Sequence, residues 1–346
     1  ITSAELKMIA DFAPLMPQLH SLNLSGCGVG PKEAGWLAAA IKFMAVVNSL
    51  TLSGNPLTGA TRDDYGDWIN IDSDMSGFVA LCAVLGKLTE VNLSDCHLGP
   101  TSTGELSKVF SDARAVINEV NVSQNRIGVE GGKALAKVIP ECSSLRWIVV
   151  GKAARIPVHN AEVTSIDASG QDLGPGEVTV LAAAISTDAV INSLTVDSTG
   201  NMRDKKVYTL TVGDETIDLS KKNLGPADVT LLTVWMQRPE VSAVLTSLTI
   251  DSTGVMTDEY GRSGQGTQKT YTLTAGEASI DLSSKNLGPA DVTLLTGWMQ
   301  RPEVSAVLTS INCLANKFGE DGLAILLTAI EGTSVRSLCG LTEGQT

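Results

Sequence analysis

The chain has 346 residues, of which 43% are hydrophobic and 18% charged, a balance typical of a soluble globular protein with ample material for a core. Its formal net charge of −13 repels phosphate backbones and anionic lipids, so neither nucleic acids nor membrane surfaces are expected partners. Aromatic residues make up only 4%, and no apolar stretch reaches the ~18–20 residues of a membrane span.

Residues 1–18 are predicted to form a capping helix at the start of the chain. Thr2 and Glu5 have the spacing of a capping box, in which each side chain bonds the backbone N–H of the other residue. The amphipathic pattern that follows Thr2 indicates a helix that covers the first repeat. The chain begins with Ile1 rather than methionine, so whether a targeting segment was removed stays open.

A unit of strand, turn and helix recurs along the chain. Its template is LHSLNLSGCGVGPKEAGWLAAAI at 19–41, and further copies begin at residues 88, 117, 163 and 308. Leu22 and Leu50 occupy equivalent positions 28 residues apart, as do Val120 and Ile148. Alternating leucines place two side chains on one face of a short strand, and a Gly-Pro pair then begins the helix. One such unit cannot bury its apolar face alone, so neighbouring units must stack.

The pattern LxxLxLxxN/CxL at this period resembles the leucine-rich repeat family, in its ribonuclease-inhibitor-like subclass, over roughly residues 15–340. The resemblance implies an α/β fold, a leucine-rich-repeat solenoid or horseshoe with a parallel β-sheet on the concave face and helices on the convex face. The Asn or Cys of the pattern is expected to hydrogen-bond backbone groups where the chain leaves each strand. It falls at Cys27, Asn55, Cys96, Asn125 and Asn316.

We interpret residues 1–346 as a single leucine-rich-repeat domain. Regular repeats follow the capping helix at 19–143. Repeats at 144–307 are predicted to alternate between a helix and a β-excursion, and a last repeat with a C-terminal cap completes the chain at 308–346.

The β-excursions replace helices in the C-terminal half. Segments 194–220 and 248–283 each run from a strand through a polar turn to an alternating YTLT sequence, which predicts a second strand rather than a helix. The nearly identical runs 217–232 and 280–295 are then the helix-bearing halves of a duplicated pair.

Each half of this duplicated pair carries unusual residues. Lys222 and Lys285 take the place of the turn-forming Asn or Cys. For Trp235 and Trp298, filling core space left by the missing neighbouring helix is favoured over an exposed patch on the convex side. The glycine-rich stretch 261–267 lacks the lysine of a P-loop, so it is predicted to be a loop tip.

An insertion at 58–77 interrupts the regular repeats. It is acidic, rich in Gly, Asp and Ser, and contains Tyr65 and Trp68. Surface loops of this kind often carry function, which makes Tyr65 and Trp68 candidate partner-binding residues. A tolerated insertion without a role is the alternative, because long loops cost little free energy.

The residues between the core leucines are predicted to form the concave face. In the C-terminal half this face carries aspartates that are staggered over neighbouring strands, so that like charges do not stand directly opposite. They are Asp167, Asp197, Asp218, Asp251 and Asp281. Together with Trp147, the one aromatic residue predicted on this face, they are candidates for binding a basic protein partner. Weak divalent-ion binding and mere solvation of the sheet by short polar side chains are the alternatives.

The resemblance implies interaction rather than catalysis, so the leading interpretation is a non-catalytic scaffold that binds a protein partner. The alternative is a regulator of an enzyme, such as a GTPase-activating or inhibitor-like leucine-rich-repeat protein. No metal-ligand spacing connects His20, His97 and His159, and neither a metal nor a cofactor is expected. The six cysteines form no CxxC motif, which is typical of reduced thiols in a cytoplasmic protein, and a monomer is expected.

Overall fold

A computed structural model describes residues 2–112, 114–188, 190–254, 256–257, 263–264 and 268–342 of the chain. The chain forms two compact units. Unit 1 comprises Ile1–Val163 and Gln171–Val190, and unit 2 comprises Thr164–Gly170 and Ile191–Thr346. The interpretation of residues 1–346 as one domain stays a prediction. Within the described residues, no helix is long and apolar enough to cross a membrane.

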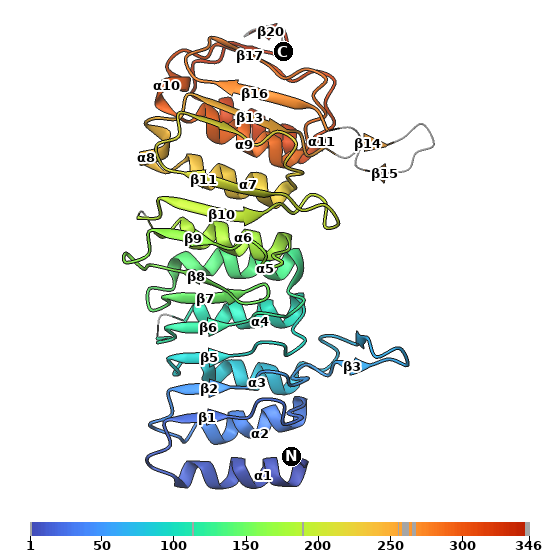
Figure 1. The fold of residues 1–346 in the computed structure, drawn as a ribbon, viewed down its shortest axis with the longest axis vertical. Coiled ribbons are helices and arrows are strands. Elements are labelled where there is room, and N and C mark those ends of the chain that lie inside the picture. Colours follow the sequence, from blue (N-terminus) through green and yellow to red (C-terminus); the bar gives the residue numbers. More distant parts are fainter. Residues whose placement is uncertain are drawn as a thin grey trace. The chain divides into compact units, whose positions relative to one another are not determined.

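Unit 1 is built around a six-stranded sheet in the order β1-β2-β5-β6-β7-β8 (Figure 1). Its strands are β1 (Ser21–Asn23), β2 (Ser49–Thr51), β5 (Glu90–Asn92), β6 (Glu119–Asn121), β7 (Trp147–Val150) and β8 (Ala154–Pro157). Its helices are α1 (Ser3–Phe12), α2 (Pro31–Ile41), α3 (Ser76–Leu85), α4 (Pro100–Phe110), α5 (Gly128–Val138) and α6 (Pro175–Ile185), with 3-10 turns at Ala13–Leu15 and Ile139–Glu141. The predicted strand–turn–helix unit is confirmed, and β1, β2, β5, β6 and β7 are parallel.

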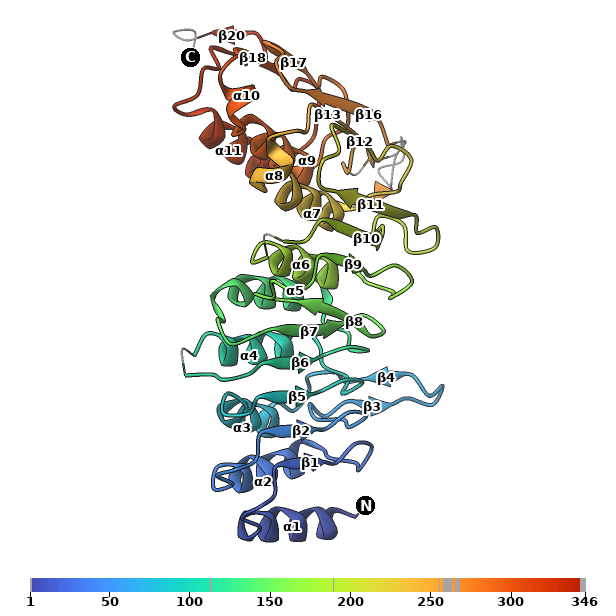
Figure 2. The same ribbon diagram turned by 60° about the vertical axis from the view of Figure 1, so that its left-hand side comes forward.

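The core of unit 1 lies between the sheet and the helices, which line one face of the sheet (Figure 2). Equivalent residues pair directly across the strands, from Leu22 through Leu50, Val91 and Val120 to Ile148. All of these except Leu22 are buried, because alternation along a strand sends every second side chain toward the helices. The other face of the sheet, which we call the open face, carries the polar residues of the same strands.

The asparagine turns expected after the strands are confirmed. The Asn125 side chain donates to the carbonyls of Leu93 (2.8 Å) and Val122 (2.9 Å) and accepts from the N–H of Leu98 (2.9 Å). Asn55 makes the equivalent bonds one repeat earlier. The asparagine thus joins two successive repeats where the chain turns toward its helix.

The capping box of Thr2 and Glu5 is also confirmed at the start of α1. The helix buries Leu6 and Ala10, but leaves Met8 58% exposed and Phe12 56% exposed. The outer surface of this predicted capping helix is therefore partly apolar.

Unit 2 contains β9 (Ser165–Asp167), β10 (Ser193–Asp197), β11 (Val207–Thr211), β12 (Thr216–Asp218), β13 (Ser247–Asp251), β14 (Met256–Thr257), β15 (Ser263–Gly264), β16 (Thr270–Thr274), β17 (Ser279–Asp281), β18 (Ser310–Asn312), β19 (Ser337–Leu338) and β20 (Leu341–Thr342). Its helices are α7 (Pro226–Met236), α8 (Pro239–Ser242), α9 (Pro289–Met299), α10 (Pro302–Ser305) and α11 (Gly319–Ile330). Of the predicted loop tip at 261–267, only Ser263–Gly264 lies within the described residues.

The predicted β-excursions are confirmed as antiparallel hairpins, with β11 on β10 and β16 on β13. Each returning strand is the last strand of its sheet, because it takes the hydrogen bonds that the strand of the next repeat would otherwise make. The described strands of unit 2 therefore form separate sheets, β9-β10-β11, β12-β13-β16 and β17-β18-β19-β20, besides the β14–β15 pair. The parallel sheet expected from the resemblance is thus divided into segments.

The two tryptophans of the duplicated helices fill the core, as predicted. Trp235 in α7 and Trp298 in α9 are both 0% exposed. A guanidinium group lies over each indole ring, that of Arg238 at 4.6 Å and that of Arg301 at 4.3 Å from the ring centroid. An exposed patch made of these tryptophans is excluded.

Candidate protein-binding surface

Two rows of side chains cross the open face of unit 1. The first row contains Ser21, Ser49, Glu90, Glu119 and Trp147, which pair directly from strand to strand. The second row, two residues further along each strand, contains Asn23, Thr51, Asn92, Asn121 and Val149. Small polar residues thus give way to glutamates and then to an aromatic ring along the first row.

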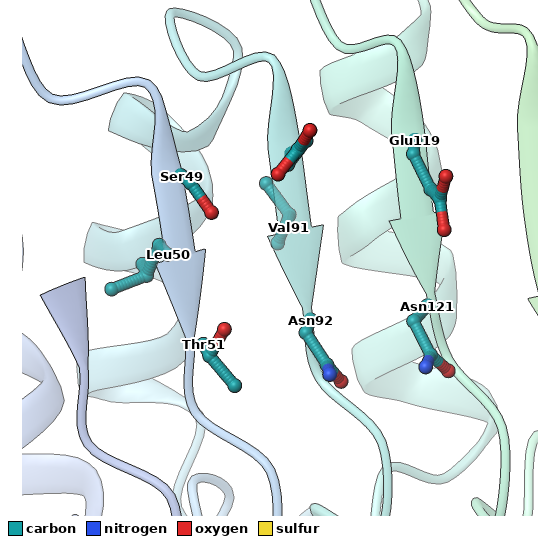
Figure 3. A pocket seen from close by; sticks show the side chains of 8 residues that line it. Ser49, Leu50, Thr51, Val91, Asn92, Glu119 and Asn121 are labelled. Atoms are coloured by element: carbon teal, nitrogen blue, oxygen red, sulfur yellow. The ribbon is translucent and has the colours of Figure 1, made fainter. Parts of the chain in front are cut away.

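A shallow hollow of about 290 Å³ lies between these rows on β2, β5 and β6 (Figure 3). Its polar lining consists of Ser49, Thr51, Glu90, Asn92, Glu119 and Asn121. Sequence reasoning placed Trp147 on this face but missed the two glutamates, which occupy the equivalent position on β5 and β6. The available signal was the repeated EVN of 90–92 and 119–121, in which glutamate directly precedes the core valine.

Trp147 lies on this open face and is half-buried. The guanidinium of Arg155, from the antiparallel strand β8, lies 3.5 Å from the Trp147 ring centroid. The same group forms an ion pair with Glu119, with 2.7 Å between Nη2 and Oε2. The predicted aromatic anchor is therefore already in contact with a cation of its own chain.

The asparagines of the second row accept hydrogen bonds from the backbone two residues ahead. Asn23, Asn92 and Asn121 accept from the N–H groups of the serines at 25, 94 and 123, at 2.9–3.0 Å. Such turns hold the chain where it leaves the strand.

Three of the candidate aspartates make this same turn in unit 2. Asp167, Asp218 and Asp281 are exposed and accept from the N–H groups of Ser169, Ser220 and Ser283 at 2.9–3.0 Å. Hydrogen bonds from the serine hydroxyl first at Asp167, and from the serine N–H first at Asp218 and Asp281, hold the pKa of each carboxyl below its usual range, with the other group of the same serine adding to the effect. All three side chains are consequently charged at neutral pH.

The other two aspartates are buried, which corrects the expectation that all five are exposed. Asp197 is 9% exposed and accepts from the Gly170 N–H at 2.7 Å. Asp251 is 6% exposed and accepts from the Lys221 N–H and the Thr270 hydroxyl. Neither carboxylate is available on the surface.

The hairpins explain why these two carboxylates are needed. At the equivalent place in unit 1, the Gly54 N–H donates to a backbone carbonyl, that of Ser94. Where β10 and β13 continue into hairpins, Asp197 and Asp251 supply the acceptor from a side chain instead. The signal was the repeated DSTG at 197–200 and 251–254.

The insertion at 58–77 forms a hairpin of β3 (Thr61–Arg62) and β4 (Trp68–Ile69). Tyr65 lies between the two strands and is 92% exposed. Trp68 stacks on His97 with ring centroids 3.6 Å apart, and the Arg62 guanidinium lies 4.6 Å from the Trp68 ring centroid. Trp68 therefore attaches the hairpin to the repeats, while Tyr65 points into solvent.

A second attachment comes from Asp72, at the end of the hairpin that leads to α3. Its carboxylate accepts from the N–H groups of Gly99, Thr101 and Ser102 at 2.9–3.2 Å. These groups belong to the N-terminus of α4, where the helix dipole favours a negative charge. The hairpin is thus held at both its tryptophan and its aspartate.

No group of three or more His, Cys, Asp or Glu among the described residues is placed to hold a metal ion. The candidate aspartates, too, do not gather into such a group among these residues.

Comparison with known proteins agrees with this architecture. The family model of the leucine rich repeat matches residues 116–136, which contain β6 and most of α5. A search of curated proteins finds no match to the chain. The match supports a leucine-rich repeat protein, a class of generally non-catalytic modules that commonly mediate contacts between proteins.

Proposed function

We propose that this chain is a non-catalytic scaffold that binds a basic protein partner through the open faces of its sheets. In this proposal the repeats stack into a solenoid of the ribonuclease-inhibitor-like subclass, and the open faces are its concave side. The 28-residue spacing of Leu22 and Leu50 and the family match at 116–136 support it. We also expect a cytoplasmic monomer, for which the unpaired cysteines and the negative charge are the support.

The observation that carries the proposal is the replacement of asparagine by aspartate at one recurring turn. Asn92 and Asn121 in unit 1 make the same hydrogen bond as Asp218 and Asp281 in unit 2. Because a neutral amide serves the turn equally well, its geometry does not require the negative charge. The charge is exposed instead on the open face of unit 2, by which we mean the face of β12 and β17 opposite their buried residues Ile217 and Ile280, where it attracts a basic surface.

The test uses this equivalence of asparagine and aspartate. The double variant Asp218→Asn with Asp281→Asn keeps the turns and removes the charges, and we expect it to lose capture of a basic partner from native lysate. A matched control, Asp321→Asn with Glu331→Gln, makes the same change of charge in and just after α11 and should capture normally. Equal capture by both variants would contradict the proposal.

The hairpin residue Tyr65 is the second expected contact. Its exposed ring offers apolar area with a hydroxyl at the tip, a combination common among residues that dominate binding energy. Tyr65→Ala should weaken the captured complex. If the captured partner is a GTPase whose rate of hydrolysis rises with this chain, the chain is a regulator of an enzyme, the alternative drawn from the sequence.

A further inference from the structure

Two glutamates stand directly opposite each other in the hollow of unit 1. Glu90 on β5 pairs in register with Glu119 on β6, and adjacent strands are about 4.8 Å apart. Like charges in this relationship destabilise a sheet. The neighbouring strands carry Ser21 and Ser49 in the same row, so the fold does not depend on glutamate there.

Only one of the two charges is compensated within the described residues. Glu119 is paired with Arg155, whose guanidinium also lies against the Trp147 ring. Glu90 is exposed and forms no ion pair with any described residue. The repulsion between the glutamates would therefore fall if a second cation reached Glu90.

Arg155 shows which cation this surface holds. A planar guanidinium can donate two parallel bonds to a carboxylate and stack on an aromatic face, whereas an ammonium group does neither as well. The hollow of about 290 Å³ is at the lower limit of a small-molecule pocket, ~300 Å³, and is open to solvent, so it suits one side chain.

We propose that the hollow of unit 1 binds an arginine side chain from an extended segment of a partner protein, with its guanidinium on Glu90 beside Glu119. Asn92 and Asn121 use their carbonyl oxygens in the turns, which leaves their amide N–H groups to donate to the partner's backbone (Figure 3). This inference rests on the proposed function and specifies the chemistry of the partner.

A defined probe tests the inference on the full chain. The probe is a fluorescently labelled seven-residue peptide of alternating serine and arginine, and its binding is measured by anisotropy at low salt. Glu90→Gln should weaken binding about fivefold, because this is the contribution of the strongest surface ion pairs to an equilibrium constant. Glu130→Gln, on the exposed side of α5, removes the same charge and should bind as the wild type does.

Two further measurements separate recognition of arginine from general attraction. The same peptide with citrulline in place of arginine keeps the shape without the charge and should not bind. Arg155→Gln frees Glu119 and should strengthen binding of the arginine peptide two- to fivefold. Equal binding of both peptides, or unchanged binding by Glu90→Gln, overturns the inference.

The outcome is distinguishable from that of the proposed function. Capture of a partner that depends on Asp218 and Asp281, with no binding of the arginine peptide, keeps the scaffold and overturns the arginine site. Peptide binding that depends on Glu90, with capture that ignores Asp218 and Asp281, supports the arginine site and contradicts the role given to the open face of unit 2.

Discussion

The Tyr208 hydroxyl donates a hydrogen bond of 2.9 Å to the buried carboxylate of Asp228, and Tyr271 makes the same bond to Asp291. Asp228 also accepts from the Gly225 N–H at the start of α7, at 2.8 Å. Each aspartate therefore links a returning hairpin strand to the helix that follows it. The repeat that contains the hairpin has no helix of its own. The link compensates for this, because it fixes the hairpin against the helix of the next repeat.

Tyr208→Phe removes the hydroxyl and leaves the buried carboxylate of Asp228 with one donor fewer. A hydrogen bond to a charged group contributes about 1.5–3 kcal/mol, so we expect the free energy of unfolding to fall by that amount. Urea denaturation followed by circular dichroism measures it. Tyr65→Phe, at a 92% exposed position, should change the free energy by less than about 0.5 kcal/mol. A similar loss in both variants would contradict the role of the hydroxyl.

Asp197 and Asp167 should differ in their effect on stability, although both belong to the predicted acidic face. Asp197→Ala removes a buried carboxylate and its part-buried hydrogen bond from the Gly170 N–H, which costs about 1–3 kcal/mol. Asp167→Ala acts at an exposed turn, where water replaces the lost bond, and should cost less than 1 kcal/mol on the same scale. Asp197→Asn keeps an acceptor oxygen and should recover part of the loss. Thermal and urea unfolding of the three variants measure their order of stability.

Acid should loosen the attachment of the 58–77 hairpin through His97. Burial of His97 against Trp68 lowers its pKa below the ordinary 6.5, and the nearby charges of Arg62 and Arg126 lower it further, although Asp95 acts in the opposite direction. The unfolded chain therefore binds a proton at higher pH than the folded chain does. Stability contributed by neutral His97 is fully present above pH 6.5 and is lost as the pH falls through the folded pKa.

The His97 pKa is measured directly by NMR titration of its imidazole C–H signal. Urea unfolding at pH 5 and pH 8 should show lower stability at pH 5, and His97→Phe, which keeps a ring on Trp68, should reduce that difference. His20→Phe, at an exposed position, is the matched control and should leave the difference in place. A His97 pKa above 6.5 would contradict the expectation.

Local pattern was sufficient to predict the repeating architecture. The helix at Pro100–Phe110 follows from Gly-Pro and a 3.6-residue apolar stripe, and the turn at Asn125 follows from one residue type at one position. The alternation of Tyr208 and Leu210 likewise predicted the strand β11. These features depend on residues that are close in sequence, so a single chain contains the information.

The candidate surface was harder to predict because it depends on register and on what covers each side chain. Glu90 and Glu119 are 29 residues apart and become neighbours only when β5 and β6 pair. The alternation of apolar and polar residues predicted which face of the strand Asp197 lies on. It could not show that the Gly170 N–H donates a hydrogen bond to the Asp197 carboxylate. A sequence pattern states which face a residue lies on, whereas its exposure is decided by the neighbouring repeat.

Close contact between α5 and α6 depends on glycine at two positions. A Cβ added at Gly132 would lie 2.3 Å from the Gly176 carbonyl oxygen, which belongs to the backbone and cannot move away cheaply. Gly132→Ala should therefore separate the helices and lower the free energy of unfolding by about 1–3 kcal/mol. Urea denaturation with an unchanged slope identifies this as a loss of stability.

Gly104 in α4 provides a control, because the same substitution there should change the free energy of unfolding in the opposite direction. A Cβ there meets no atom within 4 Å, and alanine restricts the unfolded chain more than glycine does. Gly104→Ala should accordingly stabilise the protein by about 0.5–1 kcal/mol. If both alanine variants stabilise the protein, the close approach of α5 and α6 at Gly132 is contradicted. If both destabilise, an effect other than helix contact governs the glycines of these repeats.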